Sequence, residues 1–276
     1  YIDGQKILED KIANATGANK VPFINDLVKL WSERAENFPD KTPAGEYAAQ
    51  SCQLIYDNKA LLNKTDQELY DCFDSAYKLD KDTFTNPQSL YTYFSLMVDL
   101  FDAGKKPAEE LFDKYDDIVE KVENEVKNYS ESLNELNEKA EAELTSKDLQ
   151  YKAYYESYLT NYDLIASGID EKMGTRANCD ILIPLYKKNF DANKDNALWL
   201  QRAAGKMSEK ECTDDPMFFK LVNAYHALSP SANSAYYLGI LKDKEGKTNE
   251  AIAFYEEAIS LETDSFKKST LYSRIA

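Results

Sequence analysis

The chain has 276 residues, of which only nine are Gly and eight are Pro, too few for an all-β protein with many tight turns. Its formal net charge of −16 excludes nucleic acid as a partner, because phosphate binding needs a basic face, and it disfavours anionic membrane surfaces. No stretch of about 18 apolar residues occurs, so no membrane insertion is expected.

The part of the chain before residue 107 predicts helices of ordinary length. Apolar residues recur at helical spacing, and almost no run alternates with a period of two. Pro22 stands in a first helical turn, and Asn86-Pro87 caps a tyrosine-rich helix. The predicted helices span residues 1–16, 21–37, 44–58, 66–78 and 87–102.

Residues 107–170 predict a long antiparallel helical hairpin. Two seams of apolar residues, with steps of three or four, run over residues 119–144 and 151–169 and are typical of a coiled coil. Thr145 and Asp148 form the cap of the second helix. The first helix is expected to reach residue 144. A break at Asn128-Tyr129-Ser130, which are weak helix formers, is the alternative.

The C-terminal part contains a 34-residue pattern. Residues 175–196 predict one helix, 197–207 and 216–227 a pair, and 232–263 a second pair. In this last pair small residues allow two helices to approach closely, and larger ones fill the space between them. The residues that carry the pattern are Leu238, Gly239, Gly246, Ala251, Tyr255 and Ala258.

This pattern resembles the tetratricopeptide repeat, in which Leu-Gly is followed by A-x₃-F-x₂-A over 34 residues. The resemblance implies an all-α fold, an α-solenoid of antiparallel helix pairs over residues 1–276. Its parts are divergent helix pairs over 1–106, a projecting hairpin over 107–170 and repeats over 171–276, the last incomplete. The first residue is not Met and the last lies within a helix, so a mature or excised segment is expected.

Residues with catalytic chemistry are few. His226 is the one histidine, which excludes a multi-histidine metal site, and on a repeat helix it is expected to pack or face solvent. Glycine-rich phosphate loops and nucleophile motifs are absent from the sequence. We therefore expect no enzyme activity, no metal and no cofactor.

The four cysteines are too widely spaced for a zinc knuckle. Cys179 and Cys212 stand at near-equivalent points of consecutive repeats, which leaves a disulfide and two free buried thiols equally open. Such a bond favours an oxidising compartment, a periplasm or cell envelope, and free thiols favour the cytoplasm. A looser likeness to exported envelope repeat proteins also favours the periplasm or cell envelope. Cys52 and Cys72 lie on partner helices and are left unassigned.

Repeat proteins of this kind bind ligands in a groove lined by each first helix. Carried over by register, one helix offers Trp199, Arg202, Lys206, Glu209 and Lys210, and the next offers Asn233, Tyr236, Ile240, Asp243 and Lys244. The predicted peptide groove contains Trp199, Arg202, Lys206, Tyr236 and Ile240, with Arg202 and Lys206 exposed. Alternatively, these cations balance neighbouring acids.

Three functions follow from these features. A non-enzymatic scaffold that binds a protein or peptide partner is the first, because repeat arrays offer extended surface. A structural or assembly subunit of a cell-envelope complex is the alternative. A carbohydrate binder or hydrolase is the third, suggested by the many Tyr and Asn and weakened because no polar-aromatic cluster lies on one loop.

Overall fold

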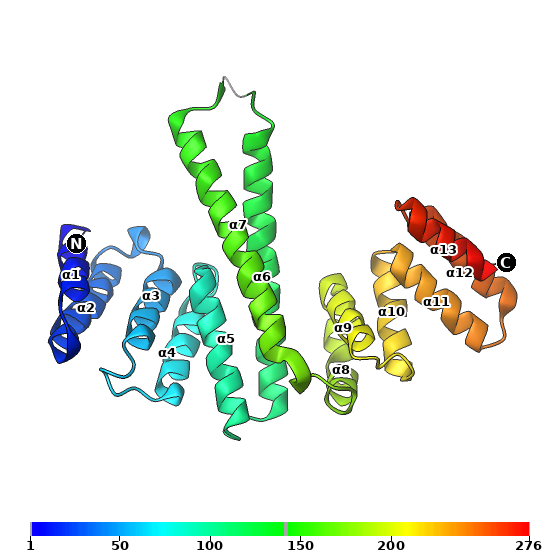
Figure 1. Ribbon diagram of the computed structural model, residues 1–276, viewed down its shortest axis with the longest axis horizontal. Coiled ribbons are helices and arrows are strands. Elements are labelled where there is room, and N and C mark those ends of the chain that lie inside the picture. Colours follow the sequence, from blue (N-terminus) through cyan, green and yellow to red (C-terminus); the bar gives the residue numbers. More distant parts are fainter. Residues whose placement is uncertain (1, 141–142, 276) are drawn as a thin grey trace. The chain divides into compact units, whose positions relative to one another are not determined.

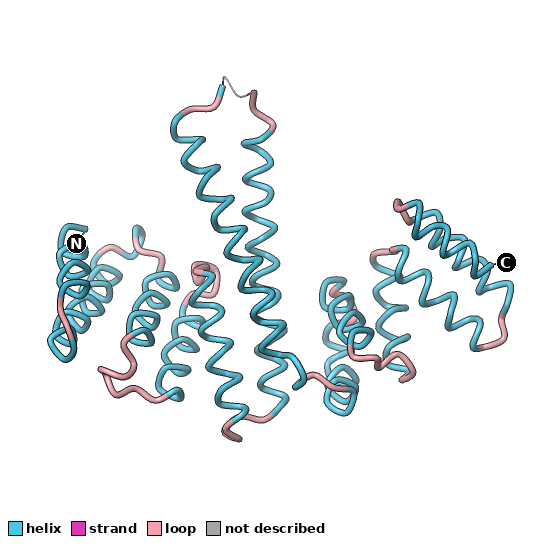
Figure 2. Tube along the Cα trace, viewed as in Figure 1, coloured by secondary structure: helices cyan, strands magenta, loops and turns pink. Residues whose placement is uncertain are grey.

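The computed structural model describes residues 2–140 and 143–275, and this part of the chain forms thirteen α-helices and no strand (Figure 2). The chain divides into two compact units, Tyr1–Gly174 and Thr175–Ala276, close to the predicted junction of hairpin and repeats. The all-α class is confirmed, whereas one solenoid over the whole chain stays a prediction. Among the described residues, no helix combines the length and apolar character needed to cross a bilayer.

The first unit is a row of helices in which each packs against the next. Their ends agree with the sequence where a cap is present: Asn86 accepts the Ser89 N–H before α5, and Thr65 and Glu68 form a capping box at α4. The seven helices are α1 (Ile2–Asn14), α2 (Val21–Asn37), α3 (Ala44–Asp57), α4 (Asp66–Leu79), α5 (Pro87–Asp102), α6 (Ala108–Asn137) and α7 (Ser146–Met173).

Helix α5 is the centre of the first unit. It packs against α4, α6 and α7 and touches α3, and most of its residues are buried. Tyr93 lies among the rings of Tyr70, Phe73, Tyr77 and Phe84, with centroid distances between 5.4 and 6.3 Å. The tyrosine-rich helix recognised in the sequence is therefore buried on most sides rather than on a single stripe.

The buried hydroxyl of Tyr93 is satisfied by charged neighbours. It donates to the carboxylate of Asp74, and Lys114 Nζ donates to it at 2.6 Å. Burial raises the pKa of Tyr93 and lowers that of Lys114, although Asp117 and Asp74 oppose the shift at Lys114. This group joins α4, α5 and α6 and stabilises the base of the hairpin.

Helices α6 and α7 run antiparallel and side by side (Figure 1). Helix α6 is continuous through Asn128-Tyr129-Ser130, so the alternative of a break there is wrong. The predicted cap of α7 is confirmed, since Asp148 N–H donates to Thr145 Oγ1 at 3.1 Å and Thr145 N–H to Asp148 Oδ2 at 2.9 Å. The expected helix end at residue 144 is wrong. Helix α6 ends at Asn137, one residue after its last buried side chain, Leu136.

Tyrosine rings fill the contact between the two hairpin helices. The Tyr129 ring of α6 lies 5.2 to 6.0 Å from four rings of α7, those of Tyr154, Tyr155, Tyr158 and Tyr162. Such tilted and edge-on ring pairs each add to the stabilisation from burial. The antiparallel hairpin is thus present, whereas knobs-into-holes packing of a coiled coil stays a prediction.

The second unit contains the predicted repeats. Leu238, Ala251, Tyr255 and Ala258 are all buried, and Tyr255 packs on Gly239 as the small-residue pattern requires. The tetratricopeptide-like fold is confirmed by these packed helix pairs. The helices are α8 (Cys179–Asn193), α9 (Ala197–Glu209), α10 (Pro216–Leu228), α11 (Ala232–Lys244), α12 (Thr248–Leu261) and α13 (Ser265–Ile275).

Candidate functional site: the groove between α9 and α11

Of the five residues predicted for the peptide groove, one is buried and four are half-buried. Trp199 is only 4% exposed and stands edge-on to Tyr186, with ring centroids 5.7 Å apart. Arg202 is half-buried, and 11% of the Lys206 side chain is exposed. The expectation that these two cations are solvent-exposed is therefore wrong.

On α11 the other two predicted groove residues are half-buried. The ring of Tyr236 lies 6.1 Å from that of Tyr255 on α12 of the same helix pair. Ile240 is half-buried one turn further on. Neither of them lines the groove described below, whereas Asn233 on the same helix does.

A displacement of one residue explains the error on α9. The N-caps Asn196 and Ser231 lie 35 residues apart, and so do Glu211 and Gly246, the left-handed residues that end the two first helices. The prediction assumed 34. Because an α-helix has 3.6 residues per turn, one residue rotates a side chain by about 100°. The α9 counterpart of Ile240 is thus Gly205.

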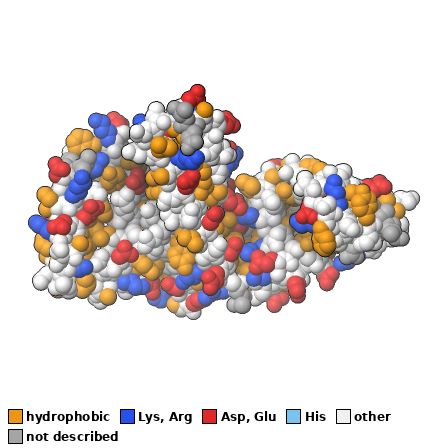
Figure 3. Space-filling view, turned by 45° about the horizontal axis from the view of Figure 1, so that its top comes forward, with side chains coloured by type: hydrophobic (Ala, Val, Ile, Leu, Met, Phe, Trp, Pro, Cys, Tyr) orange, Lys and Arg blue, Asp and Glu red, His pale blue; other side chains and the backbone are white. Residues whose placement is uncertain are grey.

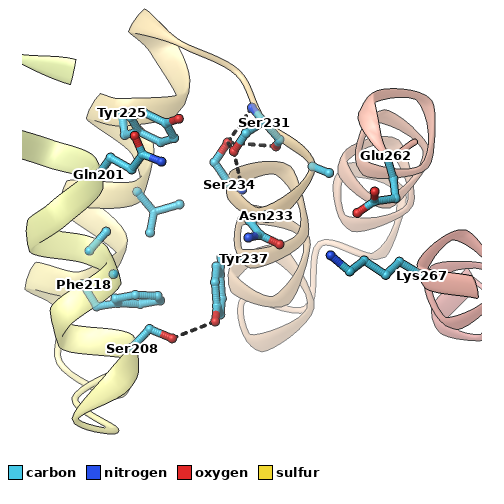
Figure 4. Close-up of a pocket in the computed structure, with 14 residues that line it drawn as sticks. Gln201, Ser208, Phe218, Tyr225, Ser231, Asn233, Ser234, Tyr237, Glu262 and Lys267 are labelled. Atoms are coloured by element: carbon cyan, nitrogen blue, oxygen red, sulfur yellow. Dashed lines mark hydrogen bonds between the residues drawn. The ribbon is translucent and has the colours of Figure 1, made fainter. Parts of the chain in front are cut away.

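A groove of about 460 Å³ lies between α9 and α11, over α10 (Figure 4). Its floor is apolar and buried, its α9 wall is made of Gln201 and small residues, and its rim carries amides and hydroxyls. The lining residues are Gln201, Ala204, Gly205, Ser208, Phe218, Val222, Tyr225, Ser231, Ala232, Asn233, Ser234, Tyr237, Glu262 and Lys267. We call it the α9–α11 groove.

Tyr237 fixes one end of the groove. Its hydroxyl lies 2.8 Å from Ser208 Oγ on α9, and its ring is edge-on to Phe218 on α10 at 5.0 Å. These two contacts connect three helices around the side chain. The wall at this end is therefore fixed before any ligand arrives.

Two amide side chains face the groove from opposite walls. Figure 4 shows Gln201 on α9 and Asn233 on α11 on either side of the open space. Both are exposed, and within the described residues neither amide has a hydrogen-bond partner. An amide offers a donor and an acceptor together, which matches the N–H and C=O of a peptide backbone.

Gly205 keeps the α9 wall open. A Cβ atom built at this position meets nothing within 4 Å, so the space in front of it is free. The residue belongs to a helix interior, where Gly is unfavourable by about 0.5–1 kcal/mol relative to Ala. Open space at a position with this cost is consistent with a surface that accommodates another chain.

Both charges at the α13 end of the groove belong to the same short segment. Glu262 accepts the backbone N–H groups of Asp264 at 3.0 Å and Thr263 at 2.8 Å. The bond from Asp264, more than that from Thr263 or the charge of Lys267, holds the pKa of the Glu262 carboxyl below its usual range. This end therefore presents a carboxylate beside an ammonium group.

Ser234, His226 and Glu257 combine the residue types of a catalytic triad, but Ser234 belongs to the capping box of α11. Ser234 is 4% exposed, and its Oγ donates to Ser231 O at 2.9 Å and accepts from Ser231 N–H at 3.0 Å. His226 Nδ1 lies 2.9 Å from that Oγ, and Nε2 lies 3.4 Å from Glu257. Because the Ser234 hydroxyl is buried and bonded to the Ser231 backbone, it caps the start of α11 and is not presented to a substrate as a nucleophile.

Lys206, one of the two cations predicted to attract an acidic partner, is paired locally, and so is the neighbouring Lys210. Lys206 and Lys210 both contact Glu209 at 2.9 Å, and these bonds hold the pKa of the Glu209 carboxyl below its usual range. Acidic and basic side chains are interspersed on the face of the molecule shown in Figure 3. For Lys206, the alternative in which the cation balances a neighbouring acid therefore holds.

Both cysteine pairs are bonded. Cys179 at the start of α8 is joined to Cys212 in the connection between α9 and α10, with Cα atoms 5.5 Å apart. Cys52 on α3 is joined to Cys72 on α4, with Cα atoms 5.8 Å apart, a pairing that the sequence left unassigned. In the described residues no group of three or more metal-ligating side chains is placed to hold an ion.

Comparison with known proteins adds little to this description. No family model matches the chain, and no curated protein matches it. Among solved structures, the crystal structure of a tetratricopeptide repeat protein from Parabacteroides merdae covers 98% of this chain and 98% of its own, with 11% sequence identity and a TM-score of 0.30. A likeness this low carries no argument about function. The tetratricopeptide-like character of the chain rests on its own helix pairs.

Proposed function

We propose that the chain is a non-enzymatic scaffold that binds an extended peptide segment of a protein partner in the α9–α11 groove. The observation that carries this proposal is the pair of unpartnered amides of Gln201 and Asn233 on opposite walls of a cavity with an apolar floor. Amides can hold a peptide backbone, and Phe218 and Val222 can receive an apolar side chain.

We propose further that the protein works outside the cytoplasm, in a periplasm or cell envelope. The support for this is that all four cysteines are paired in two disulfides. Such bonds form and persist in oxidising compartments and are rare where thiols are kept reduced. Alkylation of the cysteines in protein isolated from its own cells without reduction tests this, since labelling of all four thiols would contradict it.

A displayed library of random peptides selected on the 276-residue chain tests the binding proposal. Selected peptides should lose binding to a Gly205→Trp variant, because the new ring would occupy open space in the groove. They should also bind a Gln201→Ala/Asn233→Ala variant about tenfold or more weakly, as expected for the loss of two hydrogen bonds.

Matched controls separate the groove from general damage. Ser260→Trp places the same ring on an exposed position of α12 outside the groove, and Asn249→Ala removes an exposed amide from the same helix. Both should leave binding unchanged. Peptides that bind Gly205→Trp as well as the parent chain would place the site elsewhere and leave the role of a structural or assembly subunit as the better proposal.

A further inference from the structure

A second cavity lies in the first unit, between the beginning of α5 and the middle of α7. Its volume is about 310 Å³, and none of the residues that line it is charged. Nearly a third of the chain is Asp, Glu, Lys or Arg, so a lining without charge indicates an uncharged ligand. Its polar and aromatic residues are Asn86, Gln88, Tyr91, Tyr158 and Asn161.

One ring of the cavity is positioned by a glycine. A Cβ atom at Gly168 on α7 would lie 2.8 Å from Cε2 of Tyr91 and 3.6 Å from its Cζ. The Tyr91 ring therefore packs directly on the backbone of α7, in the space that a side chain would take. This contact fixes the ring where it meets the cavity.

The second ring of the cavity, that of Tyr158, is positioned by other tyrosines. Tyr158 lies 4.4 Å from the Tyr154 ring, 5.2 Å from that of Tyr129 and 6.3 Å from that of Tyr162. Burial raises the pKa of the Tyr158 hydroxyl, which at neutral pH is uncharged and can both donate and accept a hydrogen bond. Both aromatic walls are thus rigid, which lowers the entropy cost of binding a ligand.

The amides of the cavity are available for a ligand. Gln88 and Asn161 are exposed, and within the described residues neither has a hydrogen-bond partner. Asn86 uses its carbonyl to cap α5 at Ser89 N–H, 3.0 Å away. Each amide pairs a donor with an acceptor, the combination that adjacent sugar hydroxyls require, because a hydroxyl both donates and accepts.

We propose that this cavity binds a neutral saccharide unit of one or two rings. The C–H face of a sugar would stack on Tyr158 or Tyr91, whose ring faces carry partial negative charge, while Gln88 and Asn161 bond its hydroxyls. The volume lies at the lower end of the range for small-ligand pockets, which suits one or two rings better than an extended peptide. Leu164, 67% exposed, adds an apolar rim.

This site differs in place and chemistry from the α9–α11 groove, so the two proposals stand independently. In the sequence, no single loop carries a cluster of polar and aromatic residues, which weakened the prediction of a carbohydrate binder. The structure assembles it from two helices whose residues are about 70 positions apart, as in Tyr91 and Asn161. Helical packing, and not a loop, brings these side chains together.

Titration calorimetry of the 276-residue chain with neutral disaccharides tests the proposal. The probes are maltose, cellobiose, lactose, mannobiose and N,N′-diacetylchitobiose, with decaproline as the peptide competitor. At least one disaccharide should bind with a millimolar or lower dissociation constant. Tyr158→Ala and Asn161→Ala should each weaken that binding about tenfold, as expected for losing a stacking contact or a hydrogen bond.

Matched controls use the same residue types outside the cavity. Tyr151→Ala changes a tyrosine of α7 that is 44% exposed, and Asn134→Ala changes an exposed amide of α6. Both should bind the sugar like the parent chain. The double variant Gly168→Ala/Tyr91→Ala should bind no more weakly than Tyr91→Ala alone, because Gly168 acts only through that ring.

The proposal is overturned if none of the five disaccharides binds at millimolar concentration. It is also overturned if decaproline binds in their place with the same dependence on Tyr158, or if Tyr158→Ala and Asn161→Ala bind as tightly as their controls. None of these outcomes affects the α9–α11 groove, which is tested with peptides and with variants of the other unit.

Discussion

The helix pairs α9–α10 and α11–α12 are repeats of one plan, yet glycines 34 positions apart have opposite surroundings. A Cβ atom at Gly239 would lie 2.4 Å from Cε1 of Tyr255, whereas one at Gly205 meets nothing within 4 Å. Gly239 permits a close helix contact, and Gly205 leaves a groove open. Position within the helix, counted from its cap, therefore predicts the environment of a residue better than the period of the motif.

The connections within the two pairs differ as well. Between α11 and α12 the chain turns at Gly246, with φ of 72°. Between α9 and α10 the longer connection turns at Glu211, with φ of 58°, and a disulfide joins Cys212 back to α8. The α9–α10 pair thus has a strained residue in its turn and a disulfide bond. The α11–α12 pair has a glycine in its turn and no disulfide among its described residues.

Removing the Cys179–Cys212 bond should have the largest effect on this comparison. In a Cys179→Ala/Cys212→Ala variant the α8–α10 region should lose about 2–4 kcal/mol, because a 33-residue separation is no longer constrained in the unfolded state. Hydrogen exchange measures the free energy of opening helix by helix. The control Cys52→Ala/Cys72→Ala should leave exchange in α9–α12 unchanged. Equal protection of α8–α10 in both variants would show that the bond does not stabilise this pair.

Gly239→Ala should destabilise the second pair by about 1–3 kcal/mol, because its methyl group overlaps the Tyr255 ring and the packing must shift. Faster hydrogen exchange in α11 and α12 is the expected result. A melting temperature and an exchange pattern equal to those of the parent chain would contradict the close contact.

Gly205→Ala should have the opposite sign and stabilise α9 by about 0.5–1 kcal/mol, because Ala is the better helix former and nothing obstructs its Cβ. Thermal unfolding of the Gly205→Ala and Gly239→Ala variants, each compared with the parent chain, measures both changes in stability. A loss of stability at Gly205 would mean that the groove wall is packed rather than open.

Glu211→Gly should have the smallest effect of these substitutions and raise the free energy of unfolding by about 0.5 kcal/mol. A left-handed conformation is strained for Glu and not for Gly, although the added freedom of the unfolded chain offsets part of the gain. At the matching position of the second pair, Gly246→Ala replaces glycine by a residue with a side chain and should lower the free energy of unfolding by a similar amount. Thermal unfolding of the two variants checks both signs, and a loss at Glu211 would contradict a strained turn.

Much of the fold could be predicted from local sequence. The caps at Asn86 and Thr145, and the continuity of α6, follow from side chains that bond neighbouring backbone groups or keep one apolar seam in phase. The small-residue pattern at Gly239 and Ala258 likewise predicted a close helix pair. These features depend on residues within a few turns of each other, so the sequence determines them.

The candidate site was predicted less well. The repeat resemblance pointed to the helices that line the α9–α11 groove, but a one-residue displacement replaced Gln201 and Gly205 by Arg202 and Lys206. The N-cap Asn196 is visible in the sequence and, counted against Ser231, gives the 35-residue spacing that corrects it. Sequence period alone was insufficient because the loops within repeats differ in length.

Only the tertiary structure decided which distant residues meet. Whether Cys179 reaches Cys212, and whether Tyr91 and Asn161 border one cavity, depends on helix separations of several ångströms that local periodicity does not specify. The sequence by itself determined the helices, their caps and their apolar faces, because these arise from hydrogen bonds and burial along short segments. The cavities arise from imperfect filling between those faces, which depends on all the packed side chains at once.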